Sequence, residues 1–430
     1  PLRGCRVDTM SVTEYVWRPA AMRQIESDSE APDGFEHIIV AGIGMKAEFI
    51  EPIDASDWNS MIAGLESWGH FPEGEVIIEE TISTDRGLVL KLSSSGKLWC
   101  AEFLPWGSDG RLRARISLVP ESNCVPSGGF VSGERDVILV REWTERGNTA
   151  NNELETALQS NDYEVAKDIL FRSATALGRY HSAAESGRVT PPDSQRWNKR
   201  MEGLEARLRA NTIWRAPHTK QTMCMPSLGD VRFSDLEADD DGEYEIRIGP
   251  PRLADCLAKP NCEFPAIRDF ASLLHGLNRL HYDSRSQLDL TDLRSSLIEG
   301  WRSTAPPQWC SEKAFYTPRG GVFFWEYEQM LLDVLEAVSH QSGKPEPAVS
   351  IIKYVPSMQK SMFNSRILAA FSYMFGFFSA SSLYQVAIGN STGIIFPVAF
   401  AFAIFSFGFF YYYKKSAPPP EKPIFVAYKD

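Results

Sequence analysis

The 430-residue chain lacks the marks of a disulfide-stapled, zinc-binding or nucleic-acid-binding protein. Its cysteines are odd in number, form no C-x-x-C pair and are scattered along the chain: Cys5, Cys100, Cys124, Cys224, Cys256, Cys262 and Cys310. Such a set neither frames a small secreted domain nor supplies a zinc ribbon. Lys and Arg number 44 against 56 Asp and Glu, giving a formal charge of -12. We therefore expect no nucleic-acid partner, because phosphate neutralisation requires a basic face.

We also expect no cleavable signal in the first residues. The first residues, PLRGCRVDT, carry charges and contain no apolar stretch. Met10 is an alternative natural start, and the sequence does not decide between the two. At the other end, the residues after Lys415 form a Pro-rich tail that we expect to be extended.

Charge is absent from two long apolar runs near the C-terminus, Ile367–Ile388 and Ile394–Tyr413. Each approaches the roughly 20 residues that a helix needs to cross a bilayer. The connector Gly389–Gly393 consists of Gly, Asn, Ser and Thr, so the pair predicts a transmembrane helical hairpin. Gly376 and Ala380 are spaced to let its helices approach closely. Two buried helices of a soluble core are the alternative.

Basic residues flank this hairpin on its outer sides only. They are Lys353, Lys360, Arg366, Lys414 and Lys415, and the connector has no charge. The positive-inside bias then predicts an integral membrane protein whose soluble part and both termini lie on the cytoplasmic, or equivalent, side. The expected partners are the bilayer itself and a membrane protein.

The soluble part predicts strands followed by helices. A capped amphipathic helix is expected within 54–69, and apolar periodicity turns helical after Asn151. Between them the period is two, which predicts strands at 75–80, 87–92, 97–104, 112–119 and 136–141. The expected divisions are an extension with an acidic linker and one helix (1–70), a β-rich lobe with a hinge (71–150), a helical lobe (151–345), a linker (346–366), the hairpin (367–413) and the tail (414–430).

Five strands, a short connector (Glu142–Thr149) and then helices follow the order of a kinase-type two-lobed fold. The second lobe resembles the aminoglycoside/choline phosphotransferase branch of the protein-kinase-like superfamily. The family's catalytic loop, H-G-D-x-H-x-x-N, corresponds to Leu228-Gly229-Asp230-Val231-Arg232-Phe233-Ser234-Asp235. Its metal-binding segment corresponds to Leu253-Ala254-Asp255-Cys256, and its D-L-A helix start to Arg268-Asp269-Phe270-Ala271. The resemblance implies an α+β fold with a small β-rich N-lobe and a helical C-lobe.

The resemblance also implies roles for particular residues. Asp230 would orient the acceptor hydroxyl, while Asp235 and Asp255 would hold Mg²⁺, as phosphoryl transfer requires. ATP would lie between the lobes, against the end of the last strand near Val140 and Glu142. The alternative roles are a turn aspartate for Asp230 and a strand-end cap for Asp255.

Four departures from the family pattern favour a degenerate member. Glu102 stands where the third strand should carry the phosphate-anchoring Lys, and a carboxylate there repels triphosphate. Lys91 or Lys97 could substitute from nearby. The segment after the third strand is too short for the helix that usually supplies that Lys with a Glu partner. The loop Thr81–Gly87 has a single Gly, and Leu228 replaces the catalytic-loop His.

Three functions stay open from the sequence. The first is a membrane-anchored pseudokinase-like protein that acts as a binding or scaffold module at a membrane complex. The second is an active ATP- and Mg-dependent phosphotransferase acting on a small hydroxylated or lipid-head-group substrate. The third is a membrane-tethered acidic globular domain unrelated to kinases.

Overall fold

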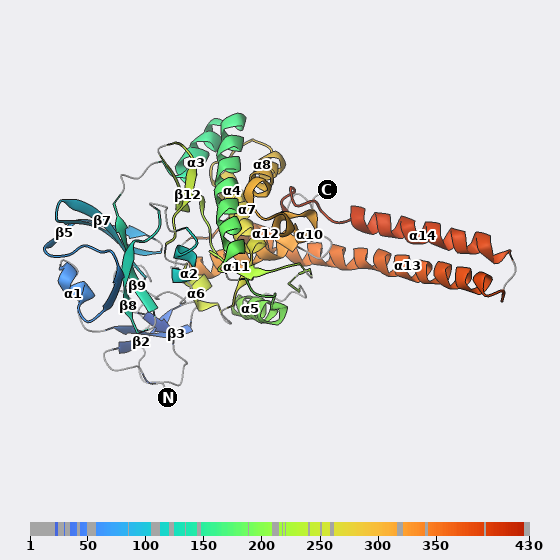
Figure 1. Cartoon of the computed structure of the whole chain (residues 1–430), viewed down its shortest axis with the longest axis horizontal. Helices are drawn as coiled ribbons and strands as arrows, with labels where there is room; N and C mark the ends of the chain where they lie inside the picture. The colour runs from blue at the N-terminus through green and yellow to red at the C-terminus, as the bar shows by residue number, and fades with distance from the viewer. Residues whose placement is uncertain are drawn as a thin grey trace.

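The fold is described from a computed structural model of the full chain. It covers residues 22–24, 30, 35–40, 44–49, 57–84, 86–104, 112–119, 124–133, 135–143, 148–187, 189–208, 215–216, 218–219, 221–239, 241–249, 252–258, 262–315, 321–339, 343–390 and 393–424. A β-rich N-lobe lies at one end, a helical C-lobe in the middle and a two-helix hairpin at the other end (Figure 1).

The N-lobe is built on an antiparallel sheet of six strands with the spatial order β4-β8-β9-β7-β6-β5. Its strands are β4 (Glu66–Gly69), β5 (Val76–Thr84), β6 (Gly87–Ser94), β7 (Lys97–Phe103), β8 (Gly128–Ser132) and β9 (Arg135–Glu142). The meander β5-β6-β7 is stabilised by a tight turn at Ser95 and Gly96, whose φ angles are 53° and 76°. Positive φ at both central residues gives the turn the twist that an antiparallel hairpin needs.

Two predictions for this lobe are corrected. The expected strand 112–119 is instead a short helix, α2 (Leu112–Ile116), which lies between β7 and β8 in the chain. The helix expected within 54–69 is shorter and spans only α1 (Trp58–Ile62). The last part of the expected range forms strand β4 instead. A separate small sheet, order β1-β3-β2, precedes α1 and consists of β1 (Met22–Gln24), β2 (Phe35–Val40) and β3 (Gly44–Phe49).

The two faces of the six-stranded sheet have different neighbours. Leu88, Leu90 and Leu92 of β6 are buried with Trp58 and Met61 of α1 in a small apolar core. Because side chains alternate along a strand, Val89 and Lys91 point to the opposite face. Val89 pairs with Glu102 of β7 in the sheet, so Glu102 lies on that same face. This second face of the sheet is the one that meets the C-lobe.

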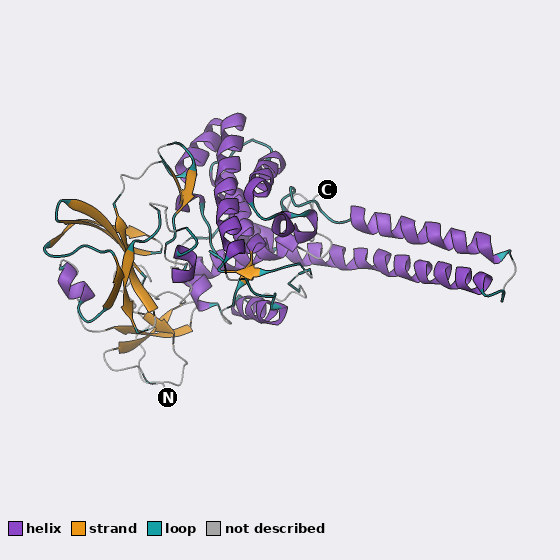
Figure 2. Ribbon diagram, viewed as in Figure 1, coloured by secondary structure: helices purple, strands orange, loops and turns teal. Residues whose placement is uncertain are grey.

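The C-lobe is a helical layer around a large apolar core (Figure 2). Its helices are α3 (Ala150–Ser160), α4 (Tyr163–Ser186), α5 (Ser194–Arg207), α6 (Leu253–Leu257), α7 (Ala266–Asp283), α8 (Leu290–Thr304), α9 (Pro307–Cys310), α10 (Glu312–Phe315) and α11 (Gly321–Ser339). Short elements between them are β10 (Cys224–Met225), η2 (Phe233–Asp235), β11 (Leu236–Ala238), β12 (Tyr244–Ile246) and β13 (Phe264–Pro265). Asp162 caps α4, with its side chain accepting from the backbone amide of Val165.

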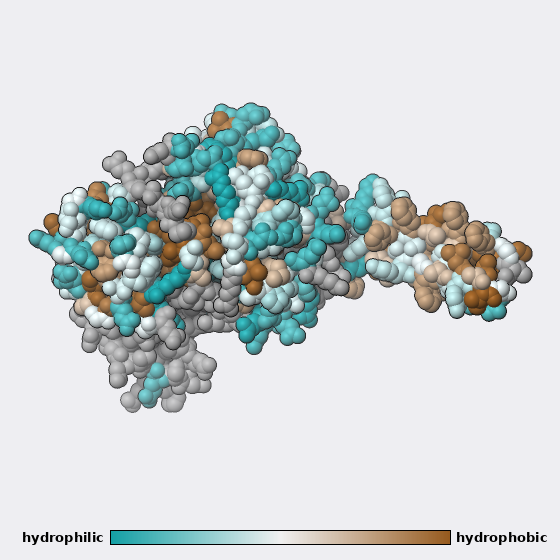
Figure 3. Space-filling view, viewed as in Figure 1, coloured by the Kyte–Doolittle hydropathy of each residue, from teal (hydrophilic) through white to brown (hydrophobic). Residues whose placement is uncertain are grey.

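After α12 (Ala348–Ile352), the C-terminal hairpin consists of α13 (Val355–Ala387) and α14 (Ile395–Lys415). Both are long and apolar enough to cross a membrane, and their most apolar windows are only 11% and 6% buried. Figure 3 shows these exposed apolar residues concentrated on the hairpin. That exposure argues against the alternative of two buried core helices.

Small residues pack between the two helices of the hairpin. Of the two that the sequence predicted there, Gly376 lies at the interface and Ala380 does not. A Cβ on Gly376 would lie 3.1 Å from Ser406 Oγ, whereas Ala380 is exposed. The hydroxyls of Ser372 and Ser406 each donate to the other residue's carbonyl at 2.8 Å, and Ser379 donates to the Ala399 carbonyl at 2.8 Å. These bonds fix the register of α13 against α14.

The hairpin is attached to the C-lobe at both ends. At the start of α13, Val355, Met358 and Met362 are buried in the C-lobe core. After α14 the chain returns to the lobe, where Ile424 is 1% exposed and the Pro420 carbonyl accepts from Arg294 Nη2 at 3.0 Å. Helix α13 therefore runs directly from the C-lobe core into the hairpin.

Candidate functional site

The predicted catalytic loop lies where the two lobes meet, and Asp269 of α7 holds its backbone. The amides of Leu228 and Gly229 donate to the Asp269 carboxylate at 2.9 and 2.8 Å, and the hydroxyl of Ser227 donates to it as well. Burial would raise the pKa of Asp269, but these hydrogen bonds and His181 outweigh it and hold the pKa below its usual value. Asp269, which the sequence marked only as a helix start, thus fixes the position of Asp230.

Gly229 is required in this loop on two grounds. Its φ is 84°, a left-handed conformation that costs an L-residue roughly 1–2 kcal/mol. A Cβ there would also lie 2.7 Å from Asp255 Oδ2 and 2.9 Å from Arg268 Nη1. We expect Gly229→Ala to lower the free energy of unfolding by about 2 kcal/mol or more. Gly242→Ala, with φ 80° but no atom near its Cβ, is the control that isolates the clash in chemical denaturation; equal losses in both variants would contradict this prediction.

Asp230 and Asp235 lie together and share one arginine from the N-lobe. Arg86, at the turn between β5 and β6, contacts both Asp235 oxygens, at 2.9 and 3.0 Å, and Asp230 Oδ2 at 3.2 Å. The guanidinium therefore binds Asp235 in the bidentate geometry that is strongest for such pairs. Asp235 also accepts from the backbone amide of Arg232 at 3.0 Å.

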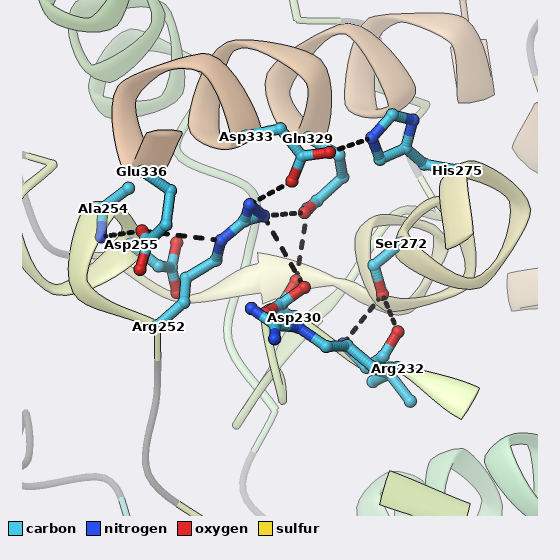
Figure 4. A network of polar contacts seen from close by, with 12 residues as sticks. Asp230, Arg232, Arg252, Ala254, Asp255, Ser272, His275, Gln329, Asp333 and Glu336 are labelled. Carbon is cyan, nitrogen blue, oxygen red and sulfur yellow. Dashed lines mark hydrogen bonds and ion pairs between the residues drawn. The ribbon is translucent and has the colours of Figure 1, made fainter. Parts of the chain in front are cut away.

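Asp230 has two further cationic neighbours from its own lobe. Arg232 Nε lies 2.9 Å from Oδ2, and Arg252 Nη1 lies 3.6 Å from Oδ1. Figure 4 shows Arg252 between Asp230 and Asp333 of α11. Burial would raise the pKa of Asp230, but the charges of Arg232, Arg252 and Arg86 outweigh it and hold the pKa far below its usual value.

Asp255 is paired in a second network of the C-lobe. Arg200 and Arg268 both donate to its Oδ1. The same two guanidiniums also contact Glu328 of α11, at 3.0 and 2.7 Å, so two arginines and two carboxylates neutralise one another. Burial would raise the pKa of Asp255, but Arg268 and Arg200 lower it more.

Glu102, at the position expected for the phosphate-anchoring Lys, is 2% exposed and faces the C-lobe. Arg141 of β9 lies 2.8 Å from its Oε2, and Arg247 of the C-lobe contacts Oε1. Arg141 also donates to the Cys124 carbonyl at 3.0 Å. The position expected for the phosphate-anchoring Lys is therefore held by a carboxylate that is paired with two guanidiniums of this chain.

The other residues predicted to bind a nucleotide have partners of their own. Lys97 and Glu142 form an exposed ion pair at 2.6 Å, and Lys91 lies over the Trp143 ring at 4.8 Å. Val140 is fully buried in β9, and its carbonyl accepts from the Ser127 amide at 2.8 Å. Contact of these four residues with a nucleotide stays a prediction.

Among the residues that the structure describes, a small cavity lies between the lobes at this site. A cavity of about 20 Å³ lies there, lined by Arg86, Arg115, Leu228, Asp230, Val231, Asp235, Ile246, Arg247, Ile248 and Gly249. That is room for about one water molecule. Within the described ranges, no group of three or more His, Cys, Asp or Glu side chains is placed to hold a metal ion.

The residues present do not fit the Mg²⁺ ions that the resemblance implies. A divalent ion needs carboxylate oxygens to coordinate it, and here the oxygens of Asp235, Asp230 and Asp255 accept from guanidinium groups. The sequence motifs predicted the three carboxylates but not Arg86, Arg252 or Arg268, which neutralise them.

No protein-family model and no curated protein matches the chain. Solved structures do. A glucosamine kinase in complex with glucosamine, ADP and inorganic phosphate is 13% identical, with a TM-score of 0.46 over 66% of this chain and 83% of that chain. An ethanolamine kinase from Plasmodium vivax is 7% identical, with a TM-score of 0.40 over 66% and 83%. A spectinomycin phosphotransferase in complex with ADP and spectinomycin is 9% identical, with a TM-score of 0.36 over 65% and 88%.

At these identities and scores, the comparisons assign no role to any residue. The order of the elements, the antiparallel N-lobe sheet and the helical C-lobe confirm the kinase-like fold that the sequence predicted. The hypothesis of a domain unrelated to kinases is therefore not retained.

Proposed function

We propose that this protein is a membrane-anchored pseudokinase-like module, which binds a partner at a membrane complex and transfers no phosphoryl group. The observation that carries the proposal is Arg86, whose guanidinium binds the two carboxylates that a kinase would use for the acceptor and the metal. Glu102 supports it, because a carboxylate replaces the cation that a triphosphate requires.

The anchor is the hairpin of α13 and α14. Basic residues flank it only where it joins the C-lobe, so the positive-inside bias puts the C-lobe and the tail on the cytoplasmic or equivalent side. Helix α13 crosses the membrane and α14 crosses back, so the kinase-like domain lies next to one leaflet. The binding partner is a protein in, or at, the same membrane.

The first test is thermal unfolding of the full chain in detergent, with and without millimolar ATP and Mg²⁺. A ligand at 100 times its dissociation constant adds about 2.7 kcal/mol to the stability of the native state, a readily measured shift. We expect no shift. A metal-dependent shift that is lost in Asp255→Ala would instead support the alternative, an active ATP- and Mg-dependent phosphotransferase.

Removal of Arg86 provides the complementary test. Arg86→Ala leaves Asp230 and Asp235 close together without their shared cation, so we expect the variant to gain stability when Mg²⁺ or Mn²⁺ is added. Arg179→Ala, which breaks an exposed ion pair with Glu243, is the matched control and should not respond. A variant lacking Arg86 that ignores both metals would contradict the assignment of these carboxylates as a former metal site.

A further inference from the structure

The base of the hairpin carries positive charge that the domain does not share. Between Pro347 and Pro420 the chain has five Lys or Arg and no Asp or Glu, whereas the whole chain carries -12. Within the described part of this segment, Lys353, Lys360, Arg366, Lys414 and Lys415 are all exposed. A strongly acidic protein therefore concentrates cations at one place, where its apolar helices begin.

The register of α13 against α14 determines where these cations lie along the hairpin axis. Ser372 bonds to Ser406 and Ser379 bonds to Ala399, so each step forward along α13 is matched by one step back along α14. Arg366 then lies opposite Tyr412, about 3 Å along the axis from Lys414 and about 5 Å from Lys415. We call these three residues, Arg366, Lys414 and Lys415, the basic collar.

The distance from the collar to the tip of the hairpin matches a bilayer. From Ile367 to Ile388, helix α13 rises about 33 Å, close to the roughly 30 Å of a hydrocarbon core. With the apolar run in the core, the collar lies at the depth of the lipid phosphates of one leaflet. The collar is also held rigidly, since α13 is continuous from Met358 and Met362 in the C-lobe core to the hairpin tip.

From this geometry we infer that the basic collar is a binding site for the phosphate groups of anionic phospholipids. The inference rests on the proposed membrane anchor and adds the lipid class that the anchor recognises. Charge complementarity favours this occupant, because the chain as a whole carries -12 and is repelled by anionic lipids, whereas the segment that contains the collar has cations and no carboxylate. The collar thereby sets how closely the domain approaches the membrane.

The test is binding of short-chain phosphatidylglycerol and phosphatidylcholine to the detergent-purified full chain, measured by native mass spectrometry. Each cation contributes about five-fold to binding of an anionic lipid, so we expect the Arg366→Gln/Lys414→Gln/Lys415→Gln variant to bind phosphatidylglycerol about 100-fold more weakly. Its phosphatidylcholine binding should not change. Lys167→Gln/Arg196→Gln/Lys199→Gln, with the same charge change on the C-lobe, should behave as the wild type.

Equal binding of both lipids by the wild type, or an equal loss in the C-lobe control variant, would overturn the inference. Displacement of phosphatidylglycerol by an equal concentration of inorganic phosphate would also overturn it, because the site would then recognise a free anion. Alkaline extraction of membranes containing the wild type separates this result from failure of the anchor. Release of the chain by that treatment would refute the membrane anchor itself, whereas retention together with equal lipid binding would refute only the lipid site.

Discussion

Replacing Glu326 by alanine is expected to lower the free energy of unfolding by about 3–5 kcal/mol. Glu326 of α11 and Arg294 of α8 are both fully buried, and they meet in a bidentate pair with distances of 2.7 and 3.0 Å. Removing the carboxylate leaves a guanidinium in the apolar core without its counter-charge. Chemical denaturation of the full chain in detergent measures the effect.

A double-mutant cycle tests whether the loss comes from the unpaired charge. Arg294→Met/Glu326→Met replaces both ions with apolar side chains of similar length, and we expect it to recover most of the stability lost in the single variant. Arg196→Ala, which breaks an exposed pair with Asp193, should change stability by less than about 1 kcal/mol. A double variant as unstable as Glu326→Ala would show that packing, not charge, causes the loss.

The second large effect is a steep loss of stability in acid. Asp230, Asp255, Asp269 and Asp333 are buried, yet each has a pKa below its usual value because cations and hydrogen-bond donors outweigh the burial. In the unfolded chain these groups take up protons at their ordinary pKa of 3.8, before they do so in the folded protein. Their contribution to stability is therefore complete above that pKa and is lost as the pH falls through the lower folded values.

Each such carboxylate contributes about 1.4 kcal/mol per pH unit in that range, so four of them predict a slope of about 5 kcal/mol per unit below pH ~4. Denaturation at a series of pH values from 6 to 2 in ~0.5-unit steps measures it. Arg86→Gln removes one of the cations that lower the pKa of folded Asp230, so this pKa moves closer to its unfolded value and the variant should lose less stability in acid, whereas Lys199→Gln should lose as much as the wild type. Stability that stays level from pH 5 to 3 would contradict this account.

Much of the fold follows from local pattern. The alternation of apolar and polar residues predicted strands β5, β6, β7 and β9. The two uncharged runs with basic flanks predicted the hairpin. Helix α2 was not predictable in the same way. In Leu112–Ile116, apolar residues fit a strand by alternation and a helix by the i, i+4 spacing of Leu112 and Ile116, and five residues are too few to separate the two periods.

The candidate site was predictable only for its carboxylates. Asp230, Asp235 and Asp255 follow a local motif, whereas their partners Arg86 and Arg268 come from elsewhere in the chain. Pairing of that kind depends on tertiary structure, which spacing does not encode. One signal was present in the motif itself: Arg232 stands at the second His of the family's loop, and its guanidinium contacts the aspartate two residues earlier.

The tail packs against the C-lobe, so the core of this lobe cannot be completed until the residues after the hairpin have been synthesised. Ile424 completes the same apolar core that contains Leu170 and Leu277, yet it leaves the ribosome after the whole hairpin. Contacts between such distant parts of a chain form late, because a long loop must close first. The C-lobe therefore reaches its final packing only after both helices of the hairpin have been made.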